Sequence, residues 1–387
     1  MISRFRDSTK DHFNFRSWSE SGKGSNDTPF FSGEGVEVRM KAIRPKIREV
    51  RQSWNNFEDY ISSLRQFLLN SKQEKRIFQK EKELHLFDTH LNKFRDWIDR
   101  DNRSEKKSIQ EDYGAVQFYT SRNGYELIFK AMNEKFRDKS KLSEDDFKNL
   151  AFLVELLNID LYNYNELNPG VSVFRDSDRV YRGLDMSQDE FKSIMKFMTD
   201  ASSVQQRYIS TPLGFLSTSL NRDVAVNFSG QKNGEGEQSS DKQGRCSVIL
   251  EIHIISLDPD LLGIYQDRHP SSIVSPICAT RIEGLSRYPQ EREVLLRGPF
   301  FQVLDVKRAD ASNIVELMML DCNRDHPTTA ALSEEEDKSA RYLFRTLVHV
   351  NRYEYCKNFY LERNRKDEVD RYQNALNASK RILDKLL

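Results

Sequence analysis

The sequence predicts an α+β fold, with a largely antiparallel sheet in the middle of the chain and helical regions on both sides. Before Asn168-Pro169-Gly170, apolar residues recur every three or four positions, which is the spacing of amphipathic helices. After this break the chain changes to short strand-like runs interleaved with short helices and hairpin-like links. From about residue 309 the helical spacing returns, so an α+β core between helical flanks is expected.

The composition bounds the class of protein and its partners. The chain has 387 residues, enough for two or three domains, and its 60 basic and 60 acidic residues give a net charge of zero. No global field attracts nucleic acid or an anionic membrane, so we expect neither as a partner. The polar N-terminus lacks a secretory signal, and no run approaches the ~18 apolar residues of a spanning helix. A soluble protein without a membrane span is expected.

The four cysteines show no metal-binding or redox spacing. Cys246, Cys278, Cys322 and Cys356 lie far apart in the sequence. Buried thiols in a reducing compartment are the simplest interpretation. We therefore expect no metal and no disulfide framework.

Changes in the pattern divide the chain into four regions. Residues 1–35 are rich in Ser, Gly and charged side chains, and we expect a flexible tail. Residues 36–104 carry two apolar seams and predict an antiparallel helical hairpin, which either packs on the next domain or binds a partner. Residues 105–308 hold the core, and residues 309–387 form a C-terminal helical region.

Within the core, the pattern predicts individual elements. Ser187 and Glu190 form a capping box that opens a helix over 187–199, and Asn221 caps a second, short helix. The polar segment 229–244 is expected to be a long mobile loop. Strands are expected at 171–174, 179–182, 214–220, 246–256, 293–297 and 300–306.

Three polar strings lie on the predicted strands, where apolar side chains are expected. They are Tyr181-Arg182-Gly183, Ser217-Thr218-Ser219 and Glu291-Arg292-Glu293. Each string taken alone has an ordinary structural interpretation. Arg182 can pair with a carboxylate, the serines can line an exposed edge strand, and the glutamates can face solvent.

The glutamate string follows a turn. Pro289 fixes the backbone of the turn, and Val294-Leu295-Leu296 then enters the core as a strand. Residues two apart on a strand share a face. We therefore expect Glu291 and Glu293 to project side by side at the mouth of this strand.

Taken together and in this order, the three strings resemble the Arg-Ser-Glu motif of mono-ADP-ribosyltransferases. The resemblance covers about residues 108–306. It includes an early helix at 115–120 with Tyr125, a helix with Val224, Ala225 and Phe228 after the serines, and a toxin turn and glutamate strand from Tyr288 to Leu296. It implies a mixed, largely antiparallel two-sheet core, here flanked by helical regions. The segment 267–287 is longer than the family's usual link before the glutamates.

The resemblance also implies a reaction and a site. ADP-ribose passes from NAD to an acceptor as nicotinamide leaves, with NAD as the substrate and no metal. Glu293 would stabilise the oxocarbenium-like ribose, Ser217 would orient Glu293, and Arg182 would hold a phosphate of NAD. The other residues implied to bind NAD are Gly183 by close backbone approach, Thr218, Ser219, and Phe228 as an apolar wall.

Glu291 decides the acceptor in this family. A carboxylate there binds a guanidinium and helps to remove its proton, so the resemblance implies an arginine acceptor and a catalytic set of Arg182, Ser217, Glu291 and Glu293. Tyr288 at the tip of the turn would stack on the target. The expected partner is a host protein with an acceptor arginine, modified in the host cytosol by a bacterial effector delivered without a Sec signal. An NAD glycohydrolase and a non-catalytic interaction protein on the same scaffold are the alternatives.

Overall fold

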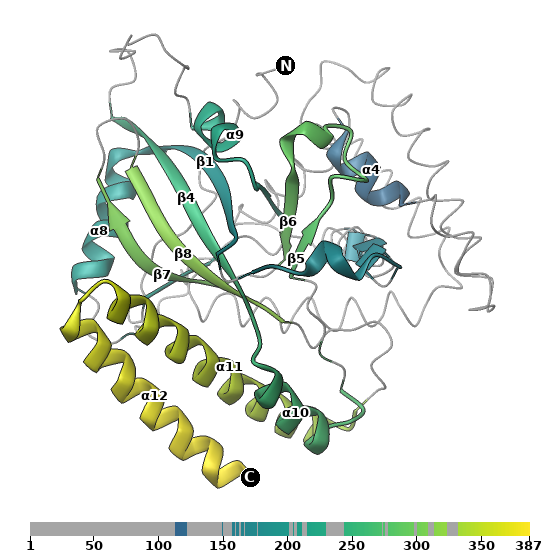
Figure 1. The fold of residues 1–387 in the computed structure, drawn as a ribbon, viewed down its shortest axis with the longest axis vertical. Coiled ribbons are helices and arrows are strands. Elements are labelled where there is room, and N and C mark those ends of the chain that lie inside the picture. The colour runs from purple at the N-terminus through teal and green to yellow at the C-terminus, as the bar shows by residue number, and fades with distance from the viewer. Residues whose placement is uncertain are drawn as a thin grey trace.

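The chain folds around one mixed β-sheet with helices packed on both of its faces (Figure 1). The computed structural model describes residues 113–121, Asn149, most of 157–229 and 244–322, and all of 332–387. The expected flexible tail (1–35), the helical hairpin (36–104), Tyr125 and nearly all of the 229–244 loop lie outside the described residues.

Eight strands form the sheet. In the order in which they lie side by side they are β2 (Tyr208–Ser210), β7 (Phe300–Lys307), β8 (Asn313–Asp321), β4 (Arg245–Ser256), β1 (Arg179–Ser187), β3 (Phe215–Ser219), β6 (Glu293–Arg297) and β5 (Ala279–Arg281). All neighbours pair antiparallel except β4 and β8, which run parallel. The predicted α+β class with largely antiparallel pairing is confirmed.

Short and long helices surround this sheet. They are α4 (Gly114–Thr120), α8 (Gln188–Asp200), α9 (Arg222–Phe228), α10 (Pro259–Arg268), α11 (Glu334–Glu362) and α12 (Lys366–Leu386), with 3-10 turns η7 (Pro169–Ser172) and η9 (Pro289–Glu291). Asn221 caps α9 as predicted, its side chain accepting from the backbone N–H of Asp223. Among the described residues, no helix is both long and apolar enough to cross a membrane.

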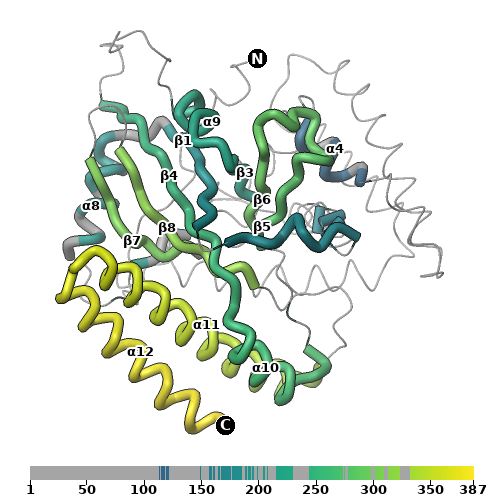
Figure 2. Tube along the Cα trace, in the orientation of Figure 1, coloured from purple at the N-terminus to yellow at the C-terminus, as the bar shows by residue number. Residues whose placement is uncertain are grey.

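Each face of the sheet buries its own apolar cluster. Leu250, Ile252 and Ile254 alternate along β4 into a first cluster, which Phe191 and Ile194 of α8 complete. The opposite face packs against α10, α11 and α12, whose apolar side chains form a second cluster with residues of β4, β7 and β8. Figure 2 shows α11 and α12 side by side along one end of the sheet. The C-terminal helices are therefore part of the same packed body as the strands.

The expected two-sheet core is wrong, because the strands of the described residues form one sheet. Its two halves, β2-β7-β8-β4-β1 and β3-β6-β5, are joined by a single residue pair, Tyr181 with Ser219. Asp321 at the end of β8 accepts hydrogen bonds from the backbone N–H groups of Cys278 (2.6 Å) and Ala279 (3.1 Å) at the start of β5. Because β8 and β5 are not neighbours in the sheet, this contact curls one half toward the other.

Three predicted elements differ from the structure. Residues expected as a strand at 171–174 instead begin inside the 3-10 turn η7, which Pro169 opens. β1 continues through Gly183 to Ser187. Residues 313–321 form β8 within the region expected to be helical, because its nearly continuous apolar run is a pattern that buried strands share with buried helices.

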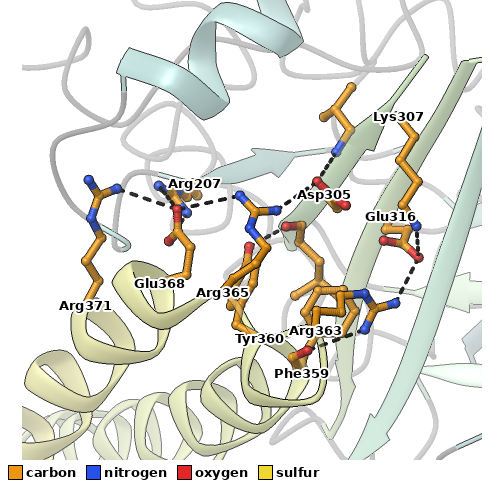
Figure 3. A network of polar contacts seen from close by, with 12 residues as sticks. Arg207, Asp305, Lys307, Glu316, Phe359, Tyr360, Arg363, Arg365, Glu368 and Arg371 are labelled. Carbon is orange, nitrogen blue, oxygen red and sulfur yellow. Dashed lines mark hydrogen bonds and ion pairs between the residues drawn. The ribbon is translucent and has the colours of Figure 1, made fainter.

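Ion pairs dock the C-terminal helices on the sheet (Figure 3). Arg207, which precedes β2, donates from both terminal nitrogens to the two oxygens of Glu368 in α12, at 2.6 and 3.1 Å, and both residues are buried. Lys307 of β7 and Arg363 after α11 both contact Glu316 of β8, at 3.0 and 3.3 Å. The buried carboxylates of Glu368 and Glu316 are therefore each paired with cations, which offsets their desolvation.

Candidate active site

The Glu293 carboxylate is held at the point where β6 begins. Glu293 is the first residue of β6 and is 4% exposed. Ser217 of β3 donates to its Oε1 at 2.5 Å, and Ser286, in the turn after β5, donates to its Oε2 at 3.2 Å. A buried carboxylate is costly unless hydrogen bonds compensate it, and here each oxygen has its own hydroxyl donor.

Arg182 contacts the backbone of Ser217 at the narrow junction between β1 and β3. The two strands pair only at Tyr181 and Ser219, and Nη1 of Arg182 donates to the main-chain oxygen of Ser217 at 2.6 Å. Ser217 thus contacts Arg182 through its backbone and Glu293 through its side chain. Three residues predicted as one set from distant parts of the sequence are joined by direct hydrogen bonds.

Gly183 is required by the packing of α9 on β1. A Cβ at this position would lie 1.8 Å from the carbonyl oxygen of Ala225 and 2.6 Å from the backbone nitrogen of Ser229. The resemblance implies that this glycine lets the backbone approach nicotinamide, whereas the contact in the structure is with the helix. Phe228, the last residue of α9, is half-buried close to the same contact.

Thr218 and Ser219 hold β6 and the turn before it. Thr218 donates to the main-chain oxygen of Val294 at 2.8 Å. Ser219 donates to the main-chain oxygen of Glu291 at 2.6 Å and accepts from the backbone N–H of Asn221 at 2.8 Å. Both hydroxyls expected to contact NAD therefore make hydrogen bonds within the protein.

The expectation that Glu291 and Glu293 share one face of a strand is wrong. Glu291 ends the 3-10 turn η9 that follows Tyr288, and β6 begins only at Glu293. Arg292 between them is left-handed, with φ 47° and ψ 50°, so the alternation of a strand does not apply across it. Glu291 and Tyr288 are both half-buried on this turn.

The backbone of the Glu-Arg-Glu string is fixed at every carbonyl. The hydroxyl of Ser219 donates to the main-chain oxygen of Glu291. The backbone N–H of Leu220 donates to the main-chain oxygen of Arg292 at 3.1 Å, and the backbone N–H of Ile282 donates to that of Glu293 at 3.0 Å. The left-handed residue is thereby held by its neighbours on both sides. Glu291 and Glu293 keep a defined relation through the turn rather than through strand geometry.

Ser286 contacts Glu293, although no motif or spacing in the sequence points to it. Besides donating to Glu293, its hydroxyl accepts from the backbone N–H of Tyr288 at 3.1 Å. No periodicity links a residue in a turn to a carboxylate seven positions later. The sequence offers one local indication of this contact. A serine two residues before Tyr288, where a turn begins, can accept a hydrogen bond from the backbone of that turn.

One group among the described residues has the composition of a metal site, and it lies next to the first string, because Glu251 of β4 pairs with Tyr181 of β1. Potential ligand atoms of Glu251, His253 and Glu316 lie within 4.8 Å of one another. Burial, with Arg179, Arg363 and Lys307 nearby, lowers the pKa of His253 to about 3. Since Lys307 and Arg363 already neutralise Glu316, we assign the group to the ion network beneath α11 and not to a metal.

Comparisons with known proteins returned structural similarities only; no family model and no curated protein sequence matches the chain. It is similar to the ADP-ribosyltransferase HopU1 of Pseudomonas syringae, at 17% identity and TM-score 0.32 over 50% of this chain and 65% of that one. It is also similar to the ADP-ribosyltransferase Vis of Vibrio splendidus (16%, TM-score 0.33, 64% and 87%) and to exoenzyme S of Pseudomonas aeruginosa (13%, TM-score 0.31, 72% and 96%).

Proposed function

We propose that the protein is a mono-ADP-ribosyltransferase that moves ADP-ribose from NAD to an arginine side chain of a target protein and releases nicotinamide. The observation that carries the proposal is the chain of hydrogen bonds from Arg182 through Ser217 to Glu293. The buried guanidinium of Arg182 suits the diphosphate of NAD. The buried carboxylate of Glu293, held by two hydrogen bonds across the strand junction, suits a ribose that becomes cationic.

Glu293 would act on the ribose. The bond between C1′ and the nicotinamide nitrogen breaks, nicotinamide leaves as a neutral molecule, and positive charge develops on the ribose. Glu293 would bind the ribose hydroxyl next to this carbon and face the developing charge, with Ser217 holding its orientation. Because nicotinamide is cationic before it leaves, the site needs no acid for its departure.

Arg182 and its neighbours would hold NAD. The planar guanidinium of Arg182 offers paired donors to a phosphate of the diphosphate. Phe228 would form an apolar wall against the nicotinamide, with Gly183 allowing α9 to lie close enough for this contact. Thr218 and Ser219 would contribute by fixing the strand and turn around the ligand.

Glu291 would bind the acceptor. Its carboxylate would pair with a guanidinium of the target and take a proton from it as the new bond to C1′ forms, and Tyr288 would stack on the same group. The turn carries both side chains, and the hydroxyl of Ser219 supports its backbone. A protein with an exposed arginine in a host cell is the partner we propose, with the chain acting as a bacterial effector; the 36–104 region could add a second contact.

An NAD glycohydrolase is the second candidate. It is favoured by one observation, since Glu291 is separated from the strand that carries Glu293 by a left-handed residue and not fixed on the same strand face. If Glu291 does not reach an acceptor beside the ribose, water would take its place.

Incubation of the full chain with labelled NAD tests the proposal. We expect label on agmatine, a small guanidinium compound, and on a protein of a eukaryotic cell lysate, with mass spectrometry placing it on arginine. Release of nicotinamide without transfer to any acceptor would instead support the glycohydrolase. Absence of both transfer and release would leave only the non-catalytic alternative.

A further inference from the structure

Ser286 lies where the carboxylate of Glu293 meets the turn that carries Tyr288. Its hydroxyl oxygen accepts the backbone N–H of Tyr288 at 3.1 Å, which leaves the hydroxyl proton directed to Oε2 of Glu293 at 3.2 Å. A hydroxyl has one proton, so the contact with Tyr288 fixes which way that proton points. The residue is 9% exposed and is separated from Glu293 along the chain by the whole η9 turn.

The carboxylate needs this second donor to hold its rotation. The terminal torsion of a glutamate side chain is broad, so one hydrogen bond to one oxygen leaves the carboxylate plane free to turn. Ser217 fixes Oε1 from β3, and Ser286 fixes Oε2 from a different element. Two donors on the two oxygens set the position and the plane of the group together.

The turn that carries Ser286 is itself well anchored. The backbone N–H of Ser286 donates to the oxygen of Ile282 at 2.8 Å, and that of Ile282 donates to the oxygen of Glu293 at 3.0 Å. Ile282 and Leu285 are buried, and Gly284 lies so close to Tyr164 that a Cβ there would be 2.8 Å from its hydroxyl. The hydroxyl of Ser286 is thus presented from a backbone that cannot easily move away.

We propose that Ser286 is a positioning residue for Glu293, which orients the carboxylate toward the ribose and links it to the turn that receives the acceptor. The inference rests on the proposed function, because it assigns Ser286 a part in the same site. The C-terminal end of the long 267–287 connection would then serve to position Glu293. Ser286 acts through Glu293 and does not itself touch the reacting atoms.

The test compares Ser286→Ala, Ser286→Thr and Ser286→Cys in the full chain. Nicotinamide release from NAD is measured without acceptor, and transfer is measured to agmatine. We expect Ser286→Ala and Ser286→Cys to lower kcat of both reactions about 10- to 100-fold, as the loss of one hydrogen bond to a charged group predicts. The KM for NAD should change less than about threefold, since Arg182 is untouched, and Ser286→Thr should recover most of kcat because it keeps the hydroxyl.

Ser272→Ala is the matched control. It removes another buried hydroxyl of the same connection, which accepts from the hydroxyl of Tyr265 in α10 at 2.7 Å. We expect its kcat to match wild type, and thermal unfolding checks that all variants are folded. If Ser286→Ala does not fold, Ser286→Cys carries the comparison.

The outcomes separate this inference from the proposed function. An active wild type with unchanged kcat in the Ala or Cys variant overturns the role of Ser286 alone. A fall in kcat that Ser286→Thr does not recover also overturns it, because the hydroxyl would then not be responsible. A folded wild type that neither releases nicotinamide nor modifies agmatine overturns the proposed function and this role with it.

Discussion

Ser217 makes two contacts that tie three strands together. Its backbone oxygen accepts from Arg182 of β1 and its side chain donates to Glu293 of β6, while the residue itself lies on β3. A short hydroxyl suits this position, because a longer side chain could not reach the neighbouring strand without displacing the carboxylate. The separate contacts of Ser219 and Ser286 extend the arrangement to Glu291 and Tyr288.

Glu291→Gln tests whether Glu291 acts on the acceptor while Glu293 acts on the ribose. We expect transfer to agmatine to fall at least about 100-fold, because an amide neither pairs with a guanidinium nor takes its proton. Nicotinamide release without acceptor should stay within about threefold of wild type. Both rates are measured on the same preparation, and a parallel loss of both would contradict separate roles.

The sequence predicted which residues belong to the site better than it predicted how they are arranged in space. Arg182, Ser217 and Glu293 were expected together, and hydrogen bonds join them; their role in catalysis stays a prediction. The relation of Glu291 to Glu293 was wrong because the left-handed backbone of Arg292 has no sequence signal in a residue other than Gly or Asn. Ser286 was not predicted, because a turn brings it to Glu293 and the regular residue spacing of a helix or strand does not.

Among the elements, α9 packs closely on β1 beside the site. Gly183 lets the last turn of α9, which ends at Phe228, approach the strand. The helix was predictable from its Asn221 cap and apolar spacing. Its closeness to β1 was not, since a glycine inside a strand has several explanations.

Gly183→Ala is expected to destabilise the fold. Its Cβ would overlap the carbonyl oxygen of Ala225, so α9 or β1 must move, at a cost of roughly 1–3 kcal/mol or more in the free energy of unfolding. Gly263→Ala in α10 is the matched control, because nothing lies within 4 Å of a Cβ there and alanine favours a helix. Thermal or urea unfolding measures both, and equal stability of the two variants would contradict the packing explanation.

β8 shows where the element prediction failed. Its apolar run lies between a segment of strands and a segment of helices, and periodicity cannot separate a fully buried strand from a buried helix. The parallel pairing with β4 decides the outcome, because it buries both faces of β8 in the centre of the sheet. Such a tertiary contact is absent from local sequence.

In the whole molecule, Asp321 links the two halves of the curled sheet. Its carboxylate holds the start of β5 against the end of β8, and burial raises its pKa to about 7 although two backbone N–H groups favour the charged form. The curl could not be predicted, since it depends on one aspartate reaching a strand that is distant in the sheet order. It brings the turn with Ser286 and the glutamates onto the same body as β1.

Asp321→Asn tests this link through the pH dependence of stability. Between about pH 4 and 7 the folded wild type binds a proton at Asp321 that the unfolded chain does not, so this group stabilises the fold as the pH falls. Asparagine keeps an acceptor oxygen but cannot titrate. The variant should therefore gain stability relative to wild type as the pH rises from 4 to 7, by up to about 1.4 kcal/mol per pH unit.

Differential scanning calorimetry from pH 4 to 8 measures this difference. His253 and His349, whose pKa values burial lowers to about 3, act in the opposite direction in both proteins, because the unfolded chain gains their protons below about pH 6.5. They cancel in the comparison. A stability difference that does not change with pH would show that Asp321 does not titrate in this range.

The rate of nicotinamide release from NAD by the Glu293→Gln variant tests whether Glu293 stabilises the ribose cation. The variant keeps the shape of the side chain and one acceptor oxygen but removes the charge, so we expect the rate to fall at least about 100-fold, with thermal unfolding showing that the variant is folded. Glu335→Gln, an exposed glutamate in the first turn of α11, should keep the wild-type rate. A folded Glu293→Gln variant within tenfold of wild type would contradict the assigned mechanism.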